Sequence, residues 1–214
     1  MTATEQRAPR GRRAPGRERG GGGASKVVSA VVGIALAAAA VWLQTVGLSA
    51  EEMNRPLASV GDKGEEVATG RFSVRVDGVK TAKSVRAGDE TAVTENVFLV
   101  VETSATVPQE PIKIRPPVLV AEDGRHFDTS DKVDRSKTLA NPWTQPGWWS
   151  SGVFVFDVPA DALRGAKASF VAPTNAFYGE PMLPAAEVDL GIDEAAAKQL
   201  GSAPQDVYTV TEKK

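Results

Sequence analysis

Residues 150–159, SSGVFVFDVP, decide the fold class of this chain. In an extended strand, successive side chains point to opposite faces, so Phe154 and Phe156 share one face. Val153 and Val155 then lie on the other face. A strand that is apolar on both faces and ends at a proline is typical of a central position in a buried sheet. We therefore expect the two phenylalanines to fill the core of a β-domain.

Two earlier stretches have the same character. FSVRVDGV, residues 72–79, places Phe72, Val74 and Val76 on one face and polar side chains on the other, as in a half-buried strand. ENVFLVVETSATV, residues 95–107, is apolar on both faces and predicts a second central strand. We expect the apolar faces of both strands to contribute to the core that Phe154 and Phe156 fill.

The rest of the body reads as short strands separated by glycine and proline, which is typical of an antiparallel β-sandwich. The further elements that we expect are a hairpin over 116–127 with its turn at Asp123 and Gly124, strands over 166–173, 186–192 and 206–212, and a short helix over 193–200 capped by Asp193. The sequence therefore predicts a mainly β fold, an antiparallel β-sandwich over residues 69–214, preceded by one transmembrane α-helix.

The N-terminal part of the chain divides into three segments of different composition. Residues 1–26 are rich in Arg, Gly and Pro and predict a disordered basic tail in the cytoplasm. Residues 27–48 carry no charge. As a helix they would span about 33 Å, which matches a hydrocarbon core of about 30 Å and predicts a transmembrane helix. Residues 49–68 are polar with Gly and Pro and predict a stalk.

Charge is distributed unevenly along the chain. Residues 1–26 have a net charge of +5 and residues 51–214 a net charge of −7. The positive-inside rule then predicts a single-pass protein of the cell membrane with a cytoplasmic N-terminus and an extracytoplasmic C-terminal domain. Because this topology accounts for the basic tail, we expect no nucleic-acid partner.

A cleaved signal peptide is the alternative interpretation of the N-terminal segment. The basic start and the GLSA sequence at 47–50 fit it. The apolar stretch is longer than the usual signal-peptide core of about 7–15 residues, and Leu48 departs from the small residue preferred before a cleavage site. With either interpretation, the body of the protein is exported.

The chain has no cysteine and one histidine, which excludes disulfides, thiolate metal sites and multi-histidine metal clusters. Asp123, Asp128, Asp131 and Asp134 gather in EDGRHFDTSDKVD. Their spacing departs from that of a calcium-binding loop, and basic residues lie between them. We therefore expect a solvated loop, no metal site and no cofactor.

A short pattern of turns and strands links the chain to a known family. An Asp-Gly hairpin is followed by a Pro-Gly turn, and that turn leads into a strand ending in Phe-x-Val-Pro. In this order the chain resembles the immunoglobulin-like extracellular domains of the DUF4352 / telomeric-repeat-binding-factor-like family of Gram-positive envelope proteins, with an actinobacterial style of composition. The matching residues are Asp123, Gly124, Phe127, Pro146, Gly147, Phe156, Val158 and Pro159.

The resemblance covers about residues 69–172. It implies a β-sandwich and an envelope location, and it implies no reaction, since such sandwiches carry unrelated functions. The chain departs from the family pattern in having an apolar segment where the family has a lipobox cysteine.

The aromatic residues before the 150–159 strand are the main binding candidates. Strand alternation would place Trp148 on the face of the phenylalanines, where we expect it to cap the core. Trp143 and Trp149 either pack over the end of the sandwich or offer rings on which a sugar stacks or a protein docks. His126 is a further candidate for contact with a ligand or partner, and we expect it to lie exposed in the hairpin.

Nothing in the sequence assigns a catalytic residue. His126 could in principle join a serine and an aspartate, but no G-x-S-x-G elbow accompanies it. We therefore expect that the protein is not an enzyme.

Three hypotheses for the function follow. The first is a membrane-anchored accessory or interaction protein of the cell envelope, with a protein partner in an export or transport complex. The second is an envelope module that binds a cell-wall glycan or another ligand through Trp143 and Trp149. The third is an exported hydrolase.

Overall fold

The computed structural model describes residues 23–46, 55–174 and 180–211. It divides into two units, residues 1–48 and residues 49–214. The second unit is a β-domain with a short helix. The predicted mainly β, sandwich-like fold is thereby confirmed.

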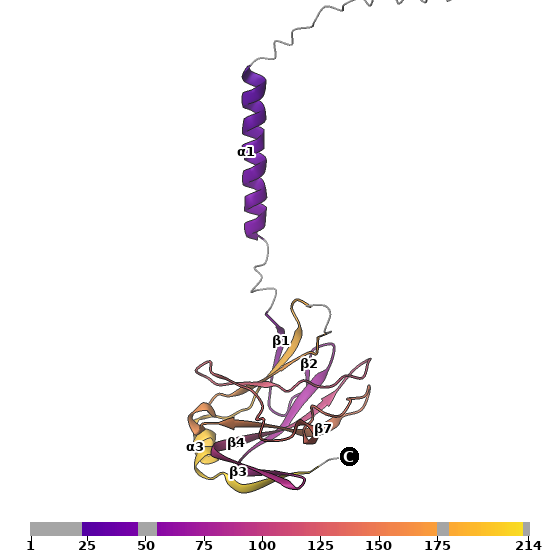
Figure 1. The fold of residues 1–214 in the computed structure, drawn as a ribbon, viewed down its shortest axis with the longest axis vertical. Helices are drawn as coiled ribbons and strands as arrows, with labels where there is room; N and C mark the ends of the chain where they lie inside the picture. The colour runs from indigo at the N-terminus through magenta and orange to yellow at the C-terminus, as the bar shows by residue number, and fades with distance from the viewer. Residues whose placement is uncertain (1–22, 47–54, 175–179, 212–214) are drawn as a thin grey trace, which may run out of the picture. The chain divides into compact units, whose positions relative to one another are not determined.

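The domain consists of two sheets (Figure 1). The first sheet has the strand order β1-β9-β8-β5-β6 and the second has the order β10-β3-β4-β7, with β2 added beside β3. The strands are β1 (Leu57–Asp62), β2 (Val67–Ala68), β3 (Ser73–Ala87), β4 (Glu90–Thr106), β5 (Val118–Val120), β6 (His126–Phe127), β7 (Ser150–Val158), β8 (Lys167–Val171), β9 (Pro184–Asp189) and β10 (Gln205–Val210). Helix α3 (Glu194–Ser202) and the 3-10 turns η1 (Arg135–Lys137) and η2 (Ala160–Ala162) complete the domain.

The main core lies between the two sheets and contains the predicted phenylalanines. On adjacent strands, Leu99 pairs with Phe156 and Val101 pairs with Phe154. All four side chains are at most 1% exposed, and Phe154 meets Phe170 of the first sheet edge to face, with ring centroids 5.9 Å apart. Burying each large apolar side chain stabilises the fold by about 1.5–3 kcal/mol. The expected core is confirmed.

A second apolar cluster covers the outer face of the second sheet. It contains Phe98 and Val100 of β4 together with Val153 and Val155 of β7. Val133, from the long loop between β6 and β7, packs over them and is 3% exposed. A loop, and not a third layer, therefore buries part of the outer face of this sheet.

Strand β7 is at the edge of its sheet, although its sequence predicted a central position. The loop before it covers this edge. The backbone amide of Ser130 donates to the carbonyl of Val155 at 2.7 Å, and that of Leu139 donates to the carbonyl of Val153 at 3.3 Å. A strand covered on both faces and along its edge has the same apolar pattern as a central strand, which explains the wrong prediction.

The loop also crosses from one face of β7 to the other. Val133 belongs to the outer cluster, whereas Leu139 is 1% exposed and belongs to the main core. Leu139 lies directly against Gly152, where a Cβ atom would come within 3.0 Å of the leucine Cβ and 3.1 Å of its backbone nitrogen. Glycine at this position is what allows the loop to wrap around the strand.

The predicted stalk over 49–68 is wrong for the residues that the structure describes there. Strand β1 pairs in parallel with β9, and β2 pairs with β3. Strand β1 is an exposed edge strand, so it lacks the alternation of apolar residues by which a strand is predicted. The sandwich is also not purely antiparallel, because β10 runs parallel to β3.

The C-terminal helix forms where it was predicted. Asp193 caps α3, its carboxylate accepting a hydrogen bond from the amide of Ala196 at 2.7 Å. The helix continues to Ser202, two residues beyond its predicted end at residue 200.

In the first unit, helix α1 (Gly23–Val46) covers most of the apolar segment 27–48, which was predicted to cross a membrane. Among the residues described, no helix is long and apolar enough for that. Residues 1–22 of the tail predicted over 1–26 lie outside the described residues, and α1 begins at Gly23.

We predict that Gly152→Ala lowers the free energy of unfolding by about 1–3 kcal/mol, because the added methyl group collides with the backbone of Leu139. Chemical denaturation of the isolated domain measures this change. Thr91→Ala, on an exposed part of β4, is the control and should change stability by less than about 0.5 kcal/mol. Equal stability of the two variants would show that the loop does not depend on this close approach.

Candidate functional site

The segment 143–149, called the tryptophan segment below, is held against the chain that follows β4. Thr144 and Ile112 exchange two backbone hydrogen bonds, of 2.8 and 3.2 Å. The amide of Gly147 donates to the carbonyl of Val107 at 3.3 Å. Gly147 has a φ of +74°, a conformation that favours glycine and turns the chain into β7. The segment is therefore a fixed support for its side chains.

All three indoles on this segment are exposed to solvent. Trp143 is 59% exposed, Trp148 is 74% exposed and Trp149 is 42% exposed. The expectation that Trp148 caps the core is wrong: β7 begins only at Ser150, so the alternation of the strand does not extend back to Trp148. Of the two alternatives for Trp143 and Trp149, the exposed arrangement is the one observed.

Two of the indoles carry a cation on their ring face. The Lys113 ammonium lies 5.7 Å from the ring centroid of Trp143, and the Arg75 guanidinium lies 5.1 Å from that of Trp149. Both distances are within the range of about 6 Å for cation–π attraction. Each cation holds the orientation of its indole ring, and both rings remain exposed to solvent.

From Trp149, a row of polar side chains runs across the outer face of the second sheet. The Arg75 guanidinium donates to the Asp77 carboxylate at 2.7 Å. Asp77 in turn accepts a hydrogen bond from Ser104, whose hydroxyl lies 2.8 Å from that of Ser151. The row connects β3, β4 and β7, and it belongs to the part of the outer face that the second apolar cluster leaves open.

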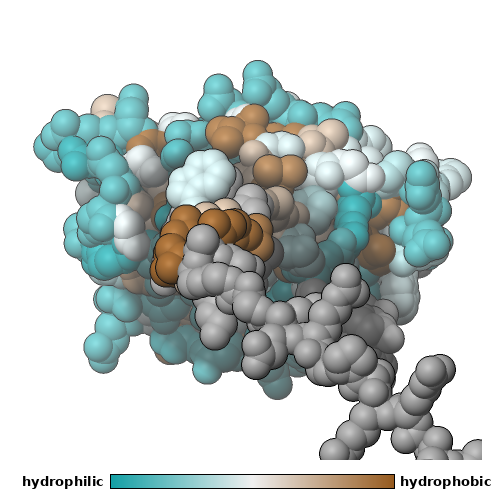
Figure 2. All heavy atoms as spheres, turned by 90° about the horizontal axis from the view of Figure 1, so that it is seen from above, coloured by the Kyte–Doolittle hydropathy of each residue, from teal (hydrophilic) through white to brown (hydrophobic). Residues whose placement is uncertain are grey.

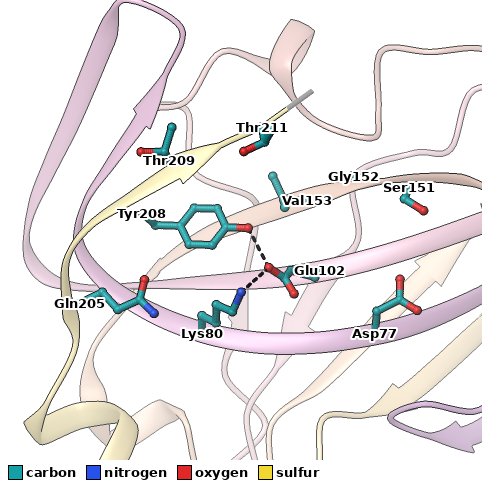
Figure 3. A pocket seen from close by; sticks show the side chains of 10 residues that line it. All are labelled: Asp77, Lys80, Glu102, Ser151, Gly152, Val153, Gln205, Tyr208, Thr209 and Thr211. Atoms are coloured by element: carbon teal, nitrogen blue, oxygen red, sulfur yellow. Dashed lines mark hydrogen bonds and ion pairs between the residues drawn. The ribbon is translucent and has the colours of Figure 1, made fainter. Parts of the chain in front are cut away.

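A second group of polar side chains centres on Glu102 of β4 (Figure 3). The Lys80 ammonium donates to Oε1 of Glu102 at 2.7 Å, and the Tyr208 hydroxyl donates to the same oxygen at 2.9 Å. The Lys80 nitrogen also lies 5.6 Å from the Tyr208 ring centroid. Partial burial is the main cause that raises the pKa of Tyr208, and the nearby Glu102 carboxylate raises it further. The Tyr208 hydroxyl therefore stays protonated and donates.

A β-bulge brings these two polar groups onto one face. Arg75 and Lys80 are five residues apart and would lie on opposite faces of a regular strand. The register between β3 and β4 shifts between Val76 and Gly78, which leaves Asp77 as the extra residue. Lys80 therefore joins Arg75 on the outer face.

Together these side chains line a groove of about 440 Å³ on the outer face. Strand β10 forms one wall of it, and its floor is the central part of the second sheet (Figure 3). The residues that line it are Asp77, Lys80, Glu102, Ser151, Gly152, Val153, Gln205, Tyr208, Thr209 and Thr211. The volume lies within the range of about 300–1,000 Å³ that is typical of small-molecule sites.

Apolar side chains are also exposed on β1 and just before β9. Leu57 and Val60 on β1 are each 69% exposed, and Met182 is 38% exposed. The amide of Leu57 donates to the carbonyl of Leu183, so Leu57 lies close to Met182. Val60 is three residues from Leu57 on a regular strand, so its side chain points to the opposite face. Figure 2 shows apolar side chains exposed within a largely hydrophilic face.

His126 lies away from the tryptophan segment in the structure. It is exposed on β6, at the edge of the first sheet, whereas Trp149 lies beside the second sheet. The structure therefore does not bring it together with the other two candidates. Within residues 23–46, 55–174 and 180–211, no group of three acidic or histidine side chains could hold a metal ion. Asp123 instead accepts from Arg125, and Asp134 caps η1.

Sequence reasoning missed the charged residues of the groove. Arg75, Asp77, Lys80 and Glu102 read as the solvated face of ordinary strands. Tyr208 comes from a strand more than a hundred residues away. The available signal was the alternating charge in SVRVDGVK, which matches a polar sheet face but gives no indication of a bulge.

Comparison with known proteins assigns no function to the chain. No family model matches the chain, and no curated protein matches it. Among solved structures, the chain is similar to the yjhA protein from Bacillus subtilis, with 14% identity, a TM-score of 0.45 and coverage of 60% of this chain and 99% of the other. It is also similar to the secreted protein MPT63 from Mycobacterium tuberculosis, with 15% identity, a TM-score of 0.43 and coverage of 63% and 98%.

A third similar structure is an uncharacterized β-sandwich protein from Clostridium difficile 630, with 10% identity, a TM-score of 0.39 and coverage of 67% and 99%. All three likenesses are too weak for a function to be transferred.

The loop that carries the tryptophan segment is also fixed to β7 by Asp157. This carboxylate accepts hydrogen bonds from Lys132 at 2.7 Å, Thr94 at 2.7 Å and Asn96 at 3.2 Å. Desolvation by partial burial alone would raise the pKa of Asp157, but these donors outweigh it and lower the pKa below its ordinary value.

We predict that Asp157→Asn destabilises the domain by roughly 1 kcal/mol near neutral pH, since Lys132 is partly exposed and its contribution is screened. Because the folded-state pKa is the lower one, the wild-type advantage is complete above about pH 4, the ordinary pKa of aspartate, and is lost as pH falls through the folded-state value. Denaturation of both proteins between pH 3 and 7 measures it. A difference that does not vary with pH would contradict the role of the carboxylate.

Proposed function

We propose that this chain is a non-catalytic binding protein of the cell envelope and that its β-sandwich holds a glycan on the tryptophan segment. One observation carries the proposal: Trp143, Trp148 and Trp149 are all exposed on a short segment that backbone hydrogen bonds hold in place. Exposing three indoles is unfavourable for a domain without a ligand for them, because each ring can bury a large apolar area.

A glycan suits this surface for two reasons. The apolar face of a sugar ring stacks on an indole, while its hydroxyls hydrogen-bond to polar groups nearby. Trp149 offers both environments, since it borders a hollow of about 430 Å³ beside Phe72 and Pro108 and also adjoins the polar row that begins at Arg75.

The proposed location outside the cytoplasm, with residues 27–48 as a retained membrane anchor, is supported by the sequence. This segment is uncharged, and the charges on its two sides have opposite sign. An absence of cysteine means that the body folds without disulfides in whichever compartment it occupies.

We predict that Trp148→Ala weakens binding to soluble peptidoglycan fragments at least about tenfold, equivalent to about 1.4 kcal/mol, because a stacking surface is removed. Titration followed by tryptophan fluorescence or calorimetry measures the affinity. Stability should change by less than about 0.5 kcal/mol, since the ring is 74% exposed.

Val93→Ala is the matched control for this prediction, because Val93 is 67% exposed on β4 and lies outside the tryptophan segment. It should leave the affinity unchanged. If the wild-type domain binds no wall fraction, or if Trp148→Ala binds as well as wild type, the glycan proposal fails.

A protein partner in a membrane export or transport complex is the second candidate function. The exposed side chains of Leu57 and Met182 favour it, since apolar side chains at an exposed edge strand are typical of a protein contact. The same chain could use this edge for a protein and the tryptophan segment for a glycan, because the two surfaces share no residue.

For this candidate we predict that the tagged full chain is recovered in the membrane fraction and, in mild detergent, brings a transport or secretion component with it in stoichiometric amount. Leu57→Asp should abolish this recovery by placing charge in the contact, whereas Val93→Asp should not. Purification followed by mass spectrometry distinguishes these results. Recovery of the chain alone would count against a stable protein partner.

A further inference from the structure

We infer that the groove around Glu102, Lys80 and Tyr208 determines which glycan is bound, and that it takes an uncharged, hydroxyl-rich saccharide in preference to a polyanion or a polycation. This inference rests on the proposed glycan-binding function. It assigns a binding role to a set of side chains on the sheet face, which is distinct from the indoles of the tryptophan segment.

The charges of the groove are balanced in pairs. Arg75 is paired with Asp77 and Lys80 with Glu102, each at 2.7 Å, so these four formal charges sum to zero. An anionic polymer that approached Lys80 would also meet the Glu102 carboxylate, and a cationic one that approached Glu102 would meet Lys80. Neither gains a net attraction that would offset the cost of removing its charges from water, so the groove favours an uncharged ligand.

Paired donors and acceptors suit neighbouring hydroxyls. A hydroxyl both donates and accepts, so one hydroxyl of a sugar donates to a carboxylate while the next accepts from the adjacent ammonium. Hydrogen bonds to charged groups are among the stronger ones in proteins. Ser151, Thr209 and Thr211 add neutral donors and acceptors around the pair.

The Glu102 carboxylate is held in place before any ligand arrives. It accepts from Lys80 on β3 and from Tyr208 on β10, and Figure 3 shows both side chains pointing at it from these two neighbouring strands. Its side chain is 25% exposed, so it is accessible to a ligand while its motion is restricted. A group that is already oriented loses little conformational freedom on binding.

A polypeptide is a poorer fit for the same groove. Val153 is the one large apolar residue of its lining, whereas the centre of a protein interface is apolar. Addition of a peptide strand beside β7 is also blocked, because Ser130 and Leu139 already bond to the edge of that strand.

The groove and the tryptophan segment form one continuous surface. Asp77 lines the groove and bonds to Arg75, and Arg75 lies on the ring of Trp149. A saccharide of a few units could therefore stack on the indole at one end and hydrogen-bond to Glu102 and Lys80 at the other.

The test measures the affinity of the full chain, in mild detergent, for three probes of different charge by calorimetry: an oligomer of N-acetylglucosamine, a glycerol-phosphate polymer and an oligomer of glucosamine. We expect the neutral N-acetylglucosamine oligomer to bind most tightly. Glu102→Gln and Lys80→Met should each weaken its binding about tenfold or more, as expected for loss of a hydrogen bond to a charged group. Tyr208→Phe, which keeps the ring, tests the orientation of Glu102 and should weaken binding less.

Lys83→Met is the matched control, since Lys83 is an exposed lysine of the same strand that bonds to Asp206 outside the groove. It should bind as wild type. Unchanged affinity of Glu102→Gln and Lys80→Met, with loss in Trp148→Ala, would overturn this inference and leave the proposed function standing. Tighter binding of either charged probe would also overturn this inference. If the protein binds none of the three probes and no wall fragment, both this inference and the proposed function are rejected.

Discussion

Strand β4 is apolar on both faces, and the rest of the domain follows from the need to keep both faces from water. Leu99 and Val101 face the first sheet, while Phe98 and Val100 face outward. The first sheet covers one side, but no third layer formed by the described residues covers the other. The loop between β6 and β7 does so in part, through Val133, and it must then cross the edge of β7. The same crossing delivers the tryptophan segment to the end of the second sheet.

The main core was predictable because it depends on local alternation. Phe154, Phe156 and the apolar face of β3 lie where their spacing placed them. Strand β1 was missed since an exposed edge strand lacks that alternation, and the edge position of β7 was missed since a loop can bury a strand as well as a neighbouring strand can. A sequence pattern indicates that a strand face is buried, but it does not indicate which element covers that face.

The candidate site was predictable in part for a similar reason. Tryptophans in a turn-rich stretch stand out in a sequence, so Trp143 and Trp149 were found, while the fate of Trp148 depended on where β7 starts. The groove was not predictable. It requires a one-residue bulge at Asp77, which moves Lys80 to the other face, and a parallel strand that brings Tyr208 from the far end of the chain. The family resemblance and the envelope location stay predictions.

The parallel pairing of β10 with β3 has a consequence for how the protein is made. Tyr208 reaches Glu102 only after β10 has been synthesised, whereas the core residues of β3, β4 and β7 all precede Val171 in the sequence. The sandwich core therefore has its main strands available before the groove has its second wall. A product truncated before β10 would keep much of the core and lack this wall of the groove.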